Sequence, residues 1–435
     1  EWDSARQSSS PRKGGGGSST VVTGERKIHK KSWRFQLQKA GPLEADIPSG
    51  QRKQIASALR PVSRELHKLL PLLTDVHNHM AGFEQERWEF NKRIMSGMNR
   101  GECDVLAARE YCVVSVEPAD WHSCSSAIWG EPGDECSSSE APRFRQMFGI
   151  HPQCVEDVID FKAAKETGKN DALGKIGHED AMMCSRSKWQ RELREHLQAC
   201  PWALVGEIGL DRNTHHRKSF DDGRQHFVLR YQLELAAELG RPVSVHCVKA
   251  DGAMLDLMSD IGAQQLPPTI CMHSFSGSLE SALQIIRLVE GKRIKKKARG
   301  GETATVANDD KVRVYFSFSA WTNLIKKNAS QLVRGLEEAE PGKGVRRFLI
   351  ESDWNTADFN FPGSDIPDVD KVLLAGLERL AELLGWDPGR VATQLAENTR
   401  HFLAPVDLQQ VAGNDAGLPS VERKESRMVH CCDDK

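Results

Sequence analysis

The feature that most constrains the fold is a repetition of eight short apolar or alternating runs, each followed by a polar stretch of helical character. This alternation is what a parallel sheet with crossover helices requires. Eight such units in one chain favour a closed barrel, typically of about 250 residues, over an open doubly wound sheet. The sequence therefore predicts an α/β fold, a TIM-type (β/α)8 barrel. The expected strands are residues 72–76, 111–116, 144–150, 203–208, 242–247, 269–273, 312–319 and 347–351.

Segments 224–239 and 370–384 carry apolar residues at steps of three and four, which predicts a helix in each. The chain is longer than a typical barrel, and long polar loop insertions account for the surplus. These insertions are residues 117–143, residues 154–201 with one helical stretch near 188–197, and residues 291–311.

The two ends of the chain have the composition of unpacked segments. Residues 1–65 are rich in Ser, Gly, Lys and Arg with weak apolar periodicity, which is typical of a disordered arm. We therefore expect a barrel domain at residues 66–405 and a flexible tail at 406–435. The chain begins without an initiator Met or the apolar region of a secretory signal, as expected of an incomplete gene product.

Composition excludes several classes of protein. Hydrophobic residues make up 39% and charged residues 28%, which is typical of a soluble folded chain, and the net charge of −2 offers no global attraction to nucleic acid or acidic lipid. No apolar run approaches the length of about 18 residues that crosses a membrane. The eleven cysteines are scattered without a Cys-x-x-Cys pair, which indicates a reducing compartment. We expect an intracellular protein, cytoplasmic or nuclear.

Polar residues that can bind metal stand at the ends of the predicted strands. The first strand ends in Asp75, His77 and His79, and alternate residues of a strand point the same way, so the two imidazoles can converge. By itself this tripeptide is equally compatible with two surface or hydrogen-bonded histidines. Further strands end in Glu207, His246, His273 and Asp353, and in a barrel these ends open onto the face that carries active sites.

Four histidines and two carboxylates gathered at one barrel mouth without a cation would cost several kcal/mol in desolvation and repulsion, about the effective penalty for burying ions. The pattern therefore favours one or two divalent metal ions. Because the ligands include no thiolate, Zn, Mn and Mg all remain admissible. The alternative is a ring of solvated polar residues at the starts of loops.

Six motifs resemble the TatD-type deoxyribonuclease family of metal-dependent hydrolases. They are DVHNH at 75–79, GIHP at 149–152, GEIGLD at 206–211, PVSVHC at 242–247, HSFSG at 273–277 and ESD at 351–353. They occur in the expected order over residues 72–402. ENTRHF at 397–402 is similar to the family's closing helix motif, although by itself it indicates a helix end. The long insertions resemble those of the fungal branch described as Cut9-interacting.

The resemblance implies specific roles for these residues. His77 and His79 would bind one ion, Glu207 would bridge, and a second ion would be bound by His246 and His273. Asp353 would bind metal and orient or deprotonate the attacking water, whose pKa a metal lowers to about 7. His151 of GIHP would contact the substrate phosphate or assist catalysis. The alternative for His151 is a buried side chain hydrogen-bonded to a loop.

Two positions depart from the family pattern. Gln153 replaces the usual His after GIHP, and Ser352 replaces the usual Thr before Asp353, and both changes threaten substrate choice more than metal binding. Trp354 and Phe275 follow proposed ligands, so either ring could stack on a nucleic-acid base, although simple packing is the alternative. The basic runs at 291–299 and 26–31 could contact phosphates or act as localisation signals, with a solvated loop as the simpler interpretation.

The sequence thus favours a divalent-metal hydrolase that cleaves DNA phosphodiester bonds with a metal-activated water. The metal site follows from residue positions, whereas DNA as the substrate follows from the resemblance alone. One alternative is a metal-dependent hydrolase of a non-nucleic ester or amide, because the same ligands polarise a carbonyl. The other is a barrel scaffold that binds a protein partner.

Overall fold

The structure is a computed structural model that describes residues 63–79, 108–125, 143–158, 188–213, 215–291, 312–354 and 368–415. Residues 1–62 of the predicted arm, the centres of the three insertions, residues 26–31 and 292–299 of the basic runs, and residues 416–435 of the predicted tail lie outside the described residues. The predicted boundaries of the barrel domain, 66 and 405, stay predictions.

The sheet has eight parallel strands in the order of the sequence, β1 to β8. Backbone hydrogen bonds just beyond the strand ends join the first and the last: Asp353 N donates to His77 O at 2.9 Å and His79 N to Trp354 O at 2.8 Å. The predicted TIM-type barrel is therefore confirmed. The strands are β1 Thr74–Asn78, β2 Glu110–Val114, β3 Arg143–Phe148, β4 Leu204–Asp211, β5 Val243–Val248, β6 Ile270–Met272, β7 Val314–Phe318 and β8 Phe348–Ile350.

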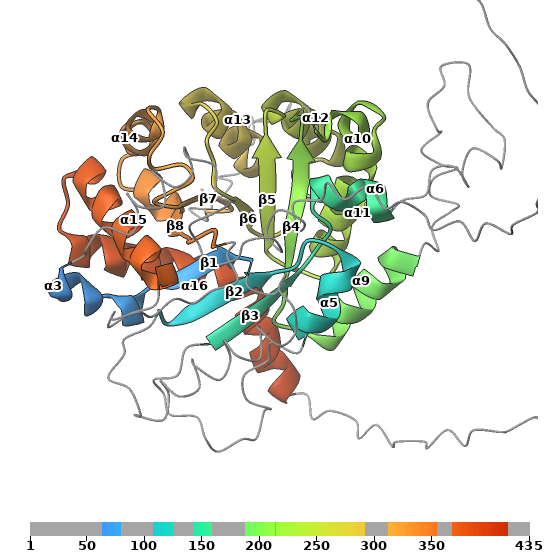
Figure 1. Ribbon diagram of the computed structural model, residues 1–435, viewed down its shortest axis with the longest axis horizontal. Helices are drawn as coiled ribbons and strands as arrows, with labels where there is room; N and C mark the ends of the chain where they lie inside the picture. Colours follow the sequence, from blue (N-terminus) through green and yellow to red (C-terminus); the bar gives the residue numbers. More distant parts are fainter. Residues whose placement is uncertain are drawn as a thin grey trace, which may run out of the picture.

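Helices surround the strands (Figure 1). The predicted helices are observed as α11 Arg224–Glu238 and α15 Asp368–Leu384, and the helical stretch in the second insertion is α9 Lys188–Ala199. The other α-helices are α3 Arg64–His67, α5 Pro118–Ser125, α6 Val155–Val158, α10 Arg217–Asp221, α12 Asp251–Ile261, α13 Leu279–Glu290, α14 Ala329–Ala339 and α16 Pro388–Asp415. Short 3-10 helices are η1 Leu70–Leu72, η3 Pro152–Cys154 and η4 Gly344–Arg347. Among the described residues, no helix is both long and apolar enough to cross a membrane.

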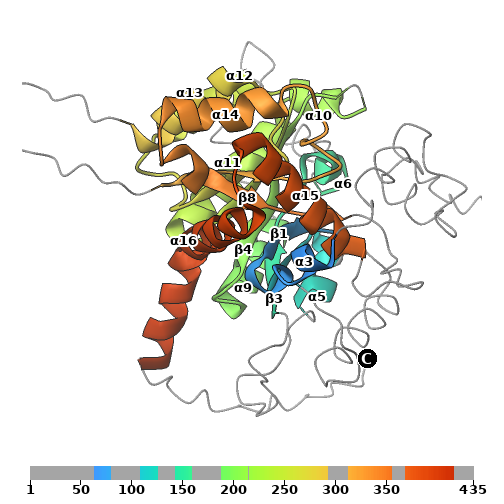
Figure 2. The ribbon, with the colours of Figure 1, turned by 90° about the vertical axis from the view of Figure 1, so that its left-hand side faces the viewer.

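The motif ENTRHF does not end a helix. It lies inside α16, whose C-terminal part extends beyond the barrel (Figure 2). Asn398 of this motif donates from Nδ2 to the carbonyl oxygens of Val345 at 2.8 Å and Phe348 at 2.7 Å. Asn398, one of the polar residues that indicate a helix end, instead attaches α16 to the segment that leads into β8.

Alternate residues of β2, β6, β7 and β8 belong to two separate apolar clusters. In β2, Tyr111 and Val113 belong to the large cluster between strands and helices, whereas Cys112 and Val114 belong to a smaller cluster inside the barrel. This division follows from the two-residue period of a strand. The barrel interior is therefore filled at its centre, and only the carboxyl ends of the strands offer room for a polar site.

A shift in the pairing register between β4 and β5 brings Glu207 into the barrel mouth. The pairing of β4 with β5 shifts between Val205 and Ile208. The predicted end of this strand at residue 208 is wrong, because Gly209 to Asp211 continue the ladder with β5. Glu207 is therefore a mid-strand residue. Gly209 has φ +154°, and a Cβ there would lie 1.9 Å from the carbonyl oxygen of His246, so only glycine allows β4 and β5 to approach this closely.

Candidate metal centre

The structure brings all the predicted site residues to the barrel mouth, on the side where the strands have their carboxyl ends. His77 lies in β1 and His79 just after it, His151 follows β3, Glu207 lies in β4 and His246 in β5. His273 follows β6, and Asp353 follows β8. Residues as far apart as positions 77 and 353 thus meet at one mouth because every parallel strand ends on the same face.

The buried carboxylate of Glu207 is the centre of the cluster, and five imidazoles surround it. Its Oε2 lies 3.4 Å from His77 Nε2 and 3.5 Å from His79 Nε2. Its Oε1 faces the remaining three rings: His246 Nδ1 at 2.8 Å, His151 Nε2 at 3.2 Å and His273 Nε2 at 3.7 Å. The two oxygens thus divide the histidines into two groups by nearest oxygen, and the groups adjoin where the rings of His77 and His273 stack with centroids 3.6 Å apart.

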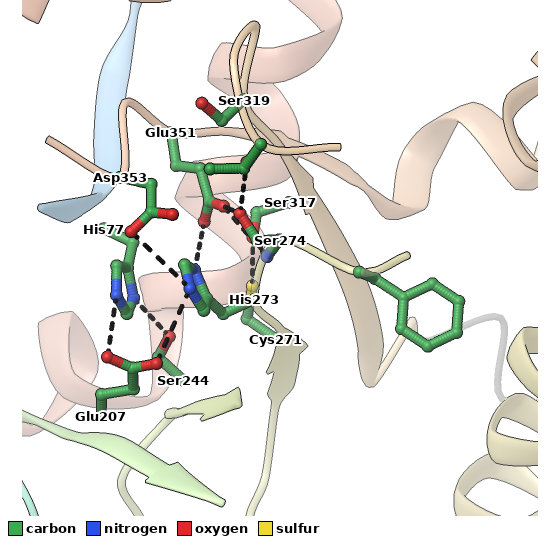
Figure 3. A network of polar contacts seen from close by, with 12 residues as sticks. His77, Glu207, Ser244, Cys271, His273, Ser274, Ser317, Ser319, Glu351 and Asp353 are labelled. Atoms are coloured by element: carbon green, nitrogen blue, oxygen red, sulfur yellow. Dashed lines mark hydrogen bonds and ion pairs between the residues drawn. The ribbon is translucent and has the colours of Figure 1, made fainter. Parts of the chain in front are cut away.

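Asp353 lies opposite Glu207 (Figure 3). Its Oδ1 is 3.4 Å from His79 Nε2 and 3.9 Å from His273 Nε2. The side chain keeps 17% of its surface exposed, compared with 2% for Glu207, so Asp353 can be reached from outside the barrel. Its backbone has φ +52°, a conformation that side-chain-bearing residues rarely adopt and that is held here by the hydrogen bond from its own N–H to His77 O.

The residues present fit a divalent cation. His77 Nε2 and Glu207 Oε2 are buried, lie 3.4 Å apart, and have no hydrogen bond of good geometry. Leaving such atoms unsatisfied costs about 1–3 kcal/mol each, which a shared cation would offset. Imidazole nitrogen and carboxylate oxygen are suitable ligands for Zn²⁺ and Mn²⁺. Three groups have ligand atoms within 4.8 Å of one another: His77, His79 and Glu207; His151, Glu207 and His246; and His77, His273 and Glu351.

Burial and mutual interactions set the charges of the cluster. Burial opposes charge on Glu207, but the imidazoles, led by His151 and His77, hold the pKa of its carboxyl well below the usual range. Burial also opposes charge on His246 and His273, yet the carboxylates beside them raise the pKa of His246 to about 9 and that of His273 to about 10. Burial lowers the pKa of His151 to about 4. The cluster thus combines ionised carboxylates with charged and neutral imidazoles.

His151 combines both interpretations offered by its sequence position. Its Nδ1 accepts a hydrogen bond from the backbone N–H of Gln153 at 3.2 Å, which is the contact expected of a buried His hydrogen-bonded to a loop. Its Nε2 nevertheless points at Glu207, and its ring lies edge-on to His246 with centroids 4.5 Å apart. The structure therefore places His151 within the cluster.

Sequence reasoning missed three polar residues that contact the cluster. Ser244 Oγ lies 2.9 Å from His77 Nδ1, Glu351 Oε2 lies 3.0 Å from His273 Nδ1, and Asp211 Oδ2 lies 3.6 Å from His246 Nε2. Their positions in the sequence could have indicated these residues. Ser244 is two residues before His246 on the same face of β5, and Glu351 and Asp211 are acids of the motifs ESD and GEIGLD. Which histidine each contacts depends on packing between strands.

The two departures from the family pattern contact residues of the site framework. Gln153 Nε2 donates to Asp211 Oδ2 at 2.7 Å. Ser352 donates from its N–H to Asp75 Oδ1 at 2.8 Å and from its hydroxyl to Asp75 Oδ2 at 2.5 Å. Ser352 therefore ties β8 to β1.

The suggestion that Trp354 or Phe275 stacks on a base is wrong for this conformation. Trp354 is 1% exposed and stacks on Trp321, with ring centroids 5.5 Å apart, and Phe275 is 3% exposed and packs against Phe316. Both rings contribute to the core, so the packing alternative is the correct one.

Comparison with known proteins gives consistent matches. The Cut9-interacting protein scn1 of Schizosaccharomyces pombe is 26% identical over 312 residues, which cover 59% of this chain and 82% of that protein. The 3'-5' ssDNA/RNA exonuclease TatD of Enterobacter lignolyticus is 31% identical over 105 residues, 23% of this chain and 38% of that protein. The solved structure of YJJV, a TatD homolog from Escherichia coli, has a TM-score of 0.48 and 17% identity, covering 77% of this chain and 98% of that one.

The family described as TatD related DNase matches residues 134–404. This range is more than half of the chain, and it contains Glu207, His246, His273 and Asp353, while His77 and His79 precede it. The chain therefore belongs to the TatD related DNase family of metal-dependent hydrolases.

Proposed function

We propose that this protein hydrolyses phosphodiester bonds in DNA with one or two divalent metal ions held at the barrel mouth. The observation that carries the proposal is the division of five imidazoles between the two oxygens of one buried carboxylate, with Asp353 facing the same space. A carboxylate whose two oxygens each face imidazole nitrogens could bind one ion through each oxygen, as a bridging ligand does.

The ligand assignment follows the two sides of Glu207. His77 and His79 would hold one ion with Oε2, while His246 and His273 would hold the second with Oε1. Asp353 would be a further ligand, since it lies beside both His79 and His273. A divalent ion bound there supplies Lewis-acid polarisation of the phosphoryl oxygen and activation of water near neutral pH.

The chain's own residues would orient the substrate and move protons. The imidazoles beside Asp353, led by His273, outweigh its burial and lower the pKa of its carboxyl, so Oδ1 is ionised and can take a proton from attacking water. His151, whose Nε2 lies 3.2 Å from Glu207 Oε1, would bind a non-bridging phosphate oxygen or transfer a proton from Nε2. The filled barrel interior below the site would exclude bulk water from one side of the reacting group.

DNA as the substrate is supported by the family description and by the printed name of the bacterial exonuclease relative. Incubation with single- and double-stranded oligonucleotides, before and after chelation and with Mg²⁺, Mn²⁺ or Zn²⁺ returned separately, tests both substrate and metal. Cleavage that stops on chelation and resumes with one metal would support the proposal. Hydrolysis of small esters or amides with none of DNA would instead support the rival substrate class.

A protein partner is a second proposal, supported by the name of the fission-yeast relative, which the match covers over 82% of its length. A scaffold role would not need the metal ligands. Partner binding that survives Asp353→Asn while hydrolysis is lost would show that the two roles are separate.

A further inference from the structure

Glu351 is a fully buried carboxylate that lies behind the cluster rather than facing Glu207 (Figure 3). It follows β8 directly, and its two oxygens meet three donors from the end of β6. Oε2 accepts from His273 Nδ1 at 3.0 Å, and Oε1 accepts from Ser274 N at 2.9 Å and from Ser274 Oγ at 2.6 Å. The hydroxyl of Ser274 also contacts Thr322 Oγ1 at 2.7 Å, which can donate to it.

Only a side chain with two accepting oxygens satisfies this set of donors. An amide offers one acceptor and one donor, so in Glu351→Gln the NH₂ group would face either His273 Nδ1 or the Ser274 N–H. The Ser274 N–H cannot reverse its direction, and the residue is held at φ +41°. The amide oxygen would therefore remain at Ser274, and His273 would lose the acceptor for its Nδ1 proton.

Whether Nδ1 of His273 carries the ring proton decides whether Nε2 can bind a metal ion. When a binding metal ion displaces the Nε2 proton of His273 and Glu351 holds the Nδ1 proton, the lone pair of Nε2 faces the space next to Glu207 Oε1 at 3.7 Å and Asp353 Oδ1 at 3.9 Å. Facing an amide donor, the ring would favour the other tautomer, in which Nε2 carries the proton and cannot bind metal.

We propose that Glu351 is a positioning residue that fixes the tautomer and ring orientation of His273 for metal binding. The inference rests on the proposed metal centre and deepens it, because it assigns a function to a carboxylate that does not itself hold the ion. Outer-shell carboxylates of this kind change metal affinity when they are replaced.

Titration with Co²⁺, followed by its visible absorption, tests the proposal in the full chain. Glu351→Gln should weaken Co²⁺ binding about 10–100-fold, and Glu351→Asp, which keeps both accepting oxygens, should recover part of the loss. The Co²⁺-loaded wild type should also show a hyperfine-shifted, slowly exchanging imidazole N–H signal that Glu351→Gln lacks. If Glu351→Gln fails to fold, the wild type decides, because a Co²⁺-loaded wild type without the slowly exchanging imidazole N–H signal would overturn the proposal.

Glu290→Gln is the matched control, because Glu290 is another poorly exposed carboxylate but lies at the opposite end of the barrel. It pairs with Arg347 at 2.6 Å and accepts from the backbone N–H of Arg313 at 2.7 Å. It should lower thermal stability and leave the Co²⁺ affinity unchanged.

A double-mutant cycle separates positioning from direct ligation. If Glu351 acts through His273, Glu351→Gln should add little further loss in a His273→Ala background. Equal losses in both backgrounds, or wild-type affinity in Glu351→Gln, would overturn the inference while leaving the metal centre in place. A wild-type protein that binds no Co²⁺ would overturn the proposed metal centre itself, and with it this inference.

Discussion

Glu207 shows how one residue can organise a site. A buried carboxylate would normally be driven toward its neutral form, yet this one is held ionised by the rings around it. The same interactions leave nitrogen and oxygen atoms facing one another without good hydrogen bonds. Such an arrangement is costly for folding alone, and the proposed cations between these atoms would offset that cost.

The proposed role of Asp353 as proton acceptor predicts the effect of removing its charge. Asp353→Asn keeps the volume but loses the base, so turnover of an oligonucleotide at saturating metal should fall about 10²–10⁴-fold. Circular dichroism should show the fold retained. Asp260→Asn is the control, because the Asp260 side chain is 72% exposed on α12. Turnover equal to that of the wild type would refute the assigned role.

Removing the two imidazoles nearest Glu207 Oε2 should weaken metal binding without unfolding the protein. Replacing both His77 and His79 with Ala removes two proposed direct ligands, so metal affinity should fall by more than the about 10–100-fold typical of an outer-shell partner. Elemental analysis after dialysis measures the bound metal. The paired substitution of His67 and His401, which lie outside the cluster, is the control. Full metal retention would exclude the pair as ligands.

At the scale of elements, β4 and the joint between β1 and β8 determine the geometry of the mouth. The register shift in β4 brings Glu207 to the level of residues that follow other strands. The carboxylate of Asp75 holds Ser352, so the segment carrying Asp353 is attached to the strand carrying His77. The site is thus supported by the strands and by the residues that directly follow them.

Because β4 and β5 approach closely at Gly209, one added methyl group there should lower stability and weaken metal binding. Gly209→Ala would place Cβ 1.9 Å from His246 O, so β4 must shift relative to β5. We expect a loss of about 1–3 kcal/mol in the free energy of unfolding, measured with urea, together with weaker metal binding. The control is Gly252→Ala in α12, where Cβ would meet nothing within 4 Å. That change should stabilise by about 0.5–1 kcal/mol. Equal effects of both variants would contradict this account.

At the scale of the whole molecule, a buried contact between β2 and α15 links stability to pH. Tyr111 donates its hydroxyl hydrogen to Asp370 at 2.8 Å, and burial raises the pKa of Asp370 to about 8. The folded protein therefore keeps a proton on Asp370 that the unfolded chain releases near pH 4. Stability should fall as pH rises through this window, by up to about 1.4 kcal/mol per pH unit for this group.

Asp370→Asn removes the titrating proton and should make that fall less steep. Urea unfolding of wild type and variant between pH 4 and pH 8, at matched ionic strength, measures the difference in slope. Asp256→Asn, an exposed change on α12, should leave the slope unchanged. Identical slopes for wild type and Asp370→Asn would show that Asp370 is already ionised in the folded protein.

Local sequence patterns were enough to predict eight strands, their order and the face on which the polar residues gather. These features depend on the two-residue period of strands, the helical period between them, and the polar residues placed at strand ends, all of which are local. For this reason His77, Glu207, His246, His273 and Asp353 could be identified before any coordinates.

How these residues meet depends on contacts that form in the folded barrel. The extension of β4 past Glu207, the burial of Trp354 against Trp321, and the pairing of Glu351 with His273 each join segments brought together by register and packing. Single-residue shifts in register change which side chains face each other, and no local period encodes such a shift. The positions of the candidate site residues could thus be predicted from the sequence, whereas the contacts between their side chains depend on the closed barrel.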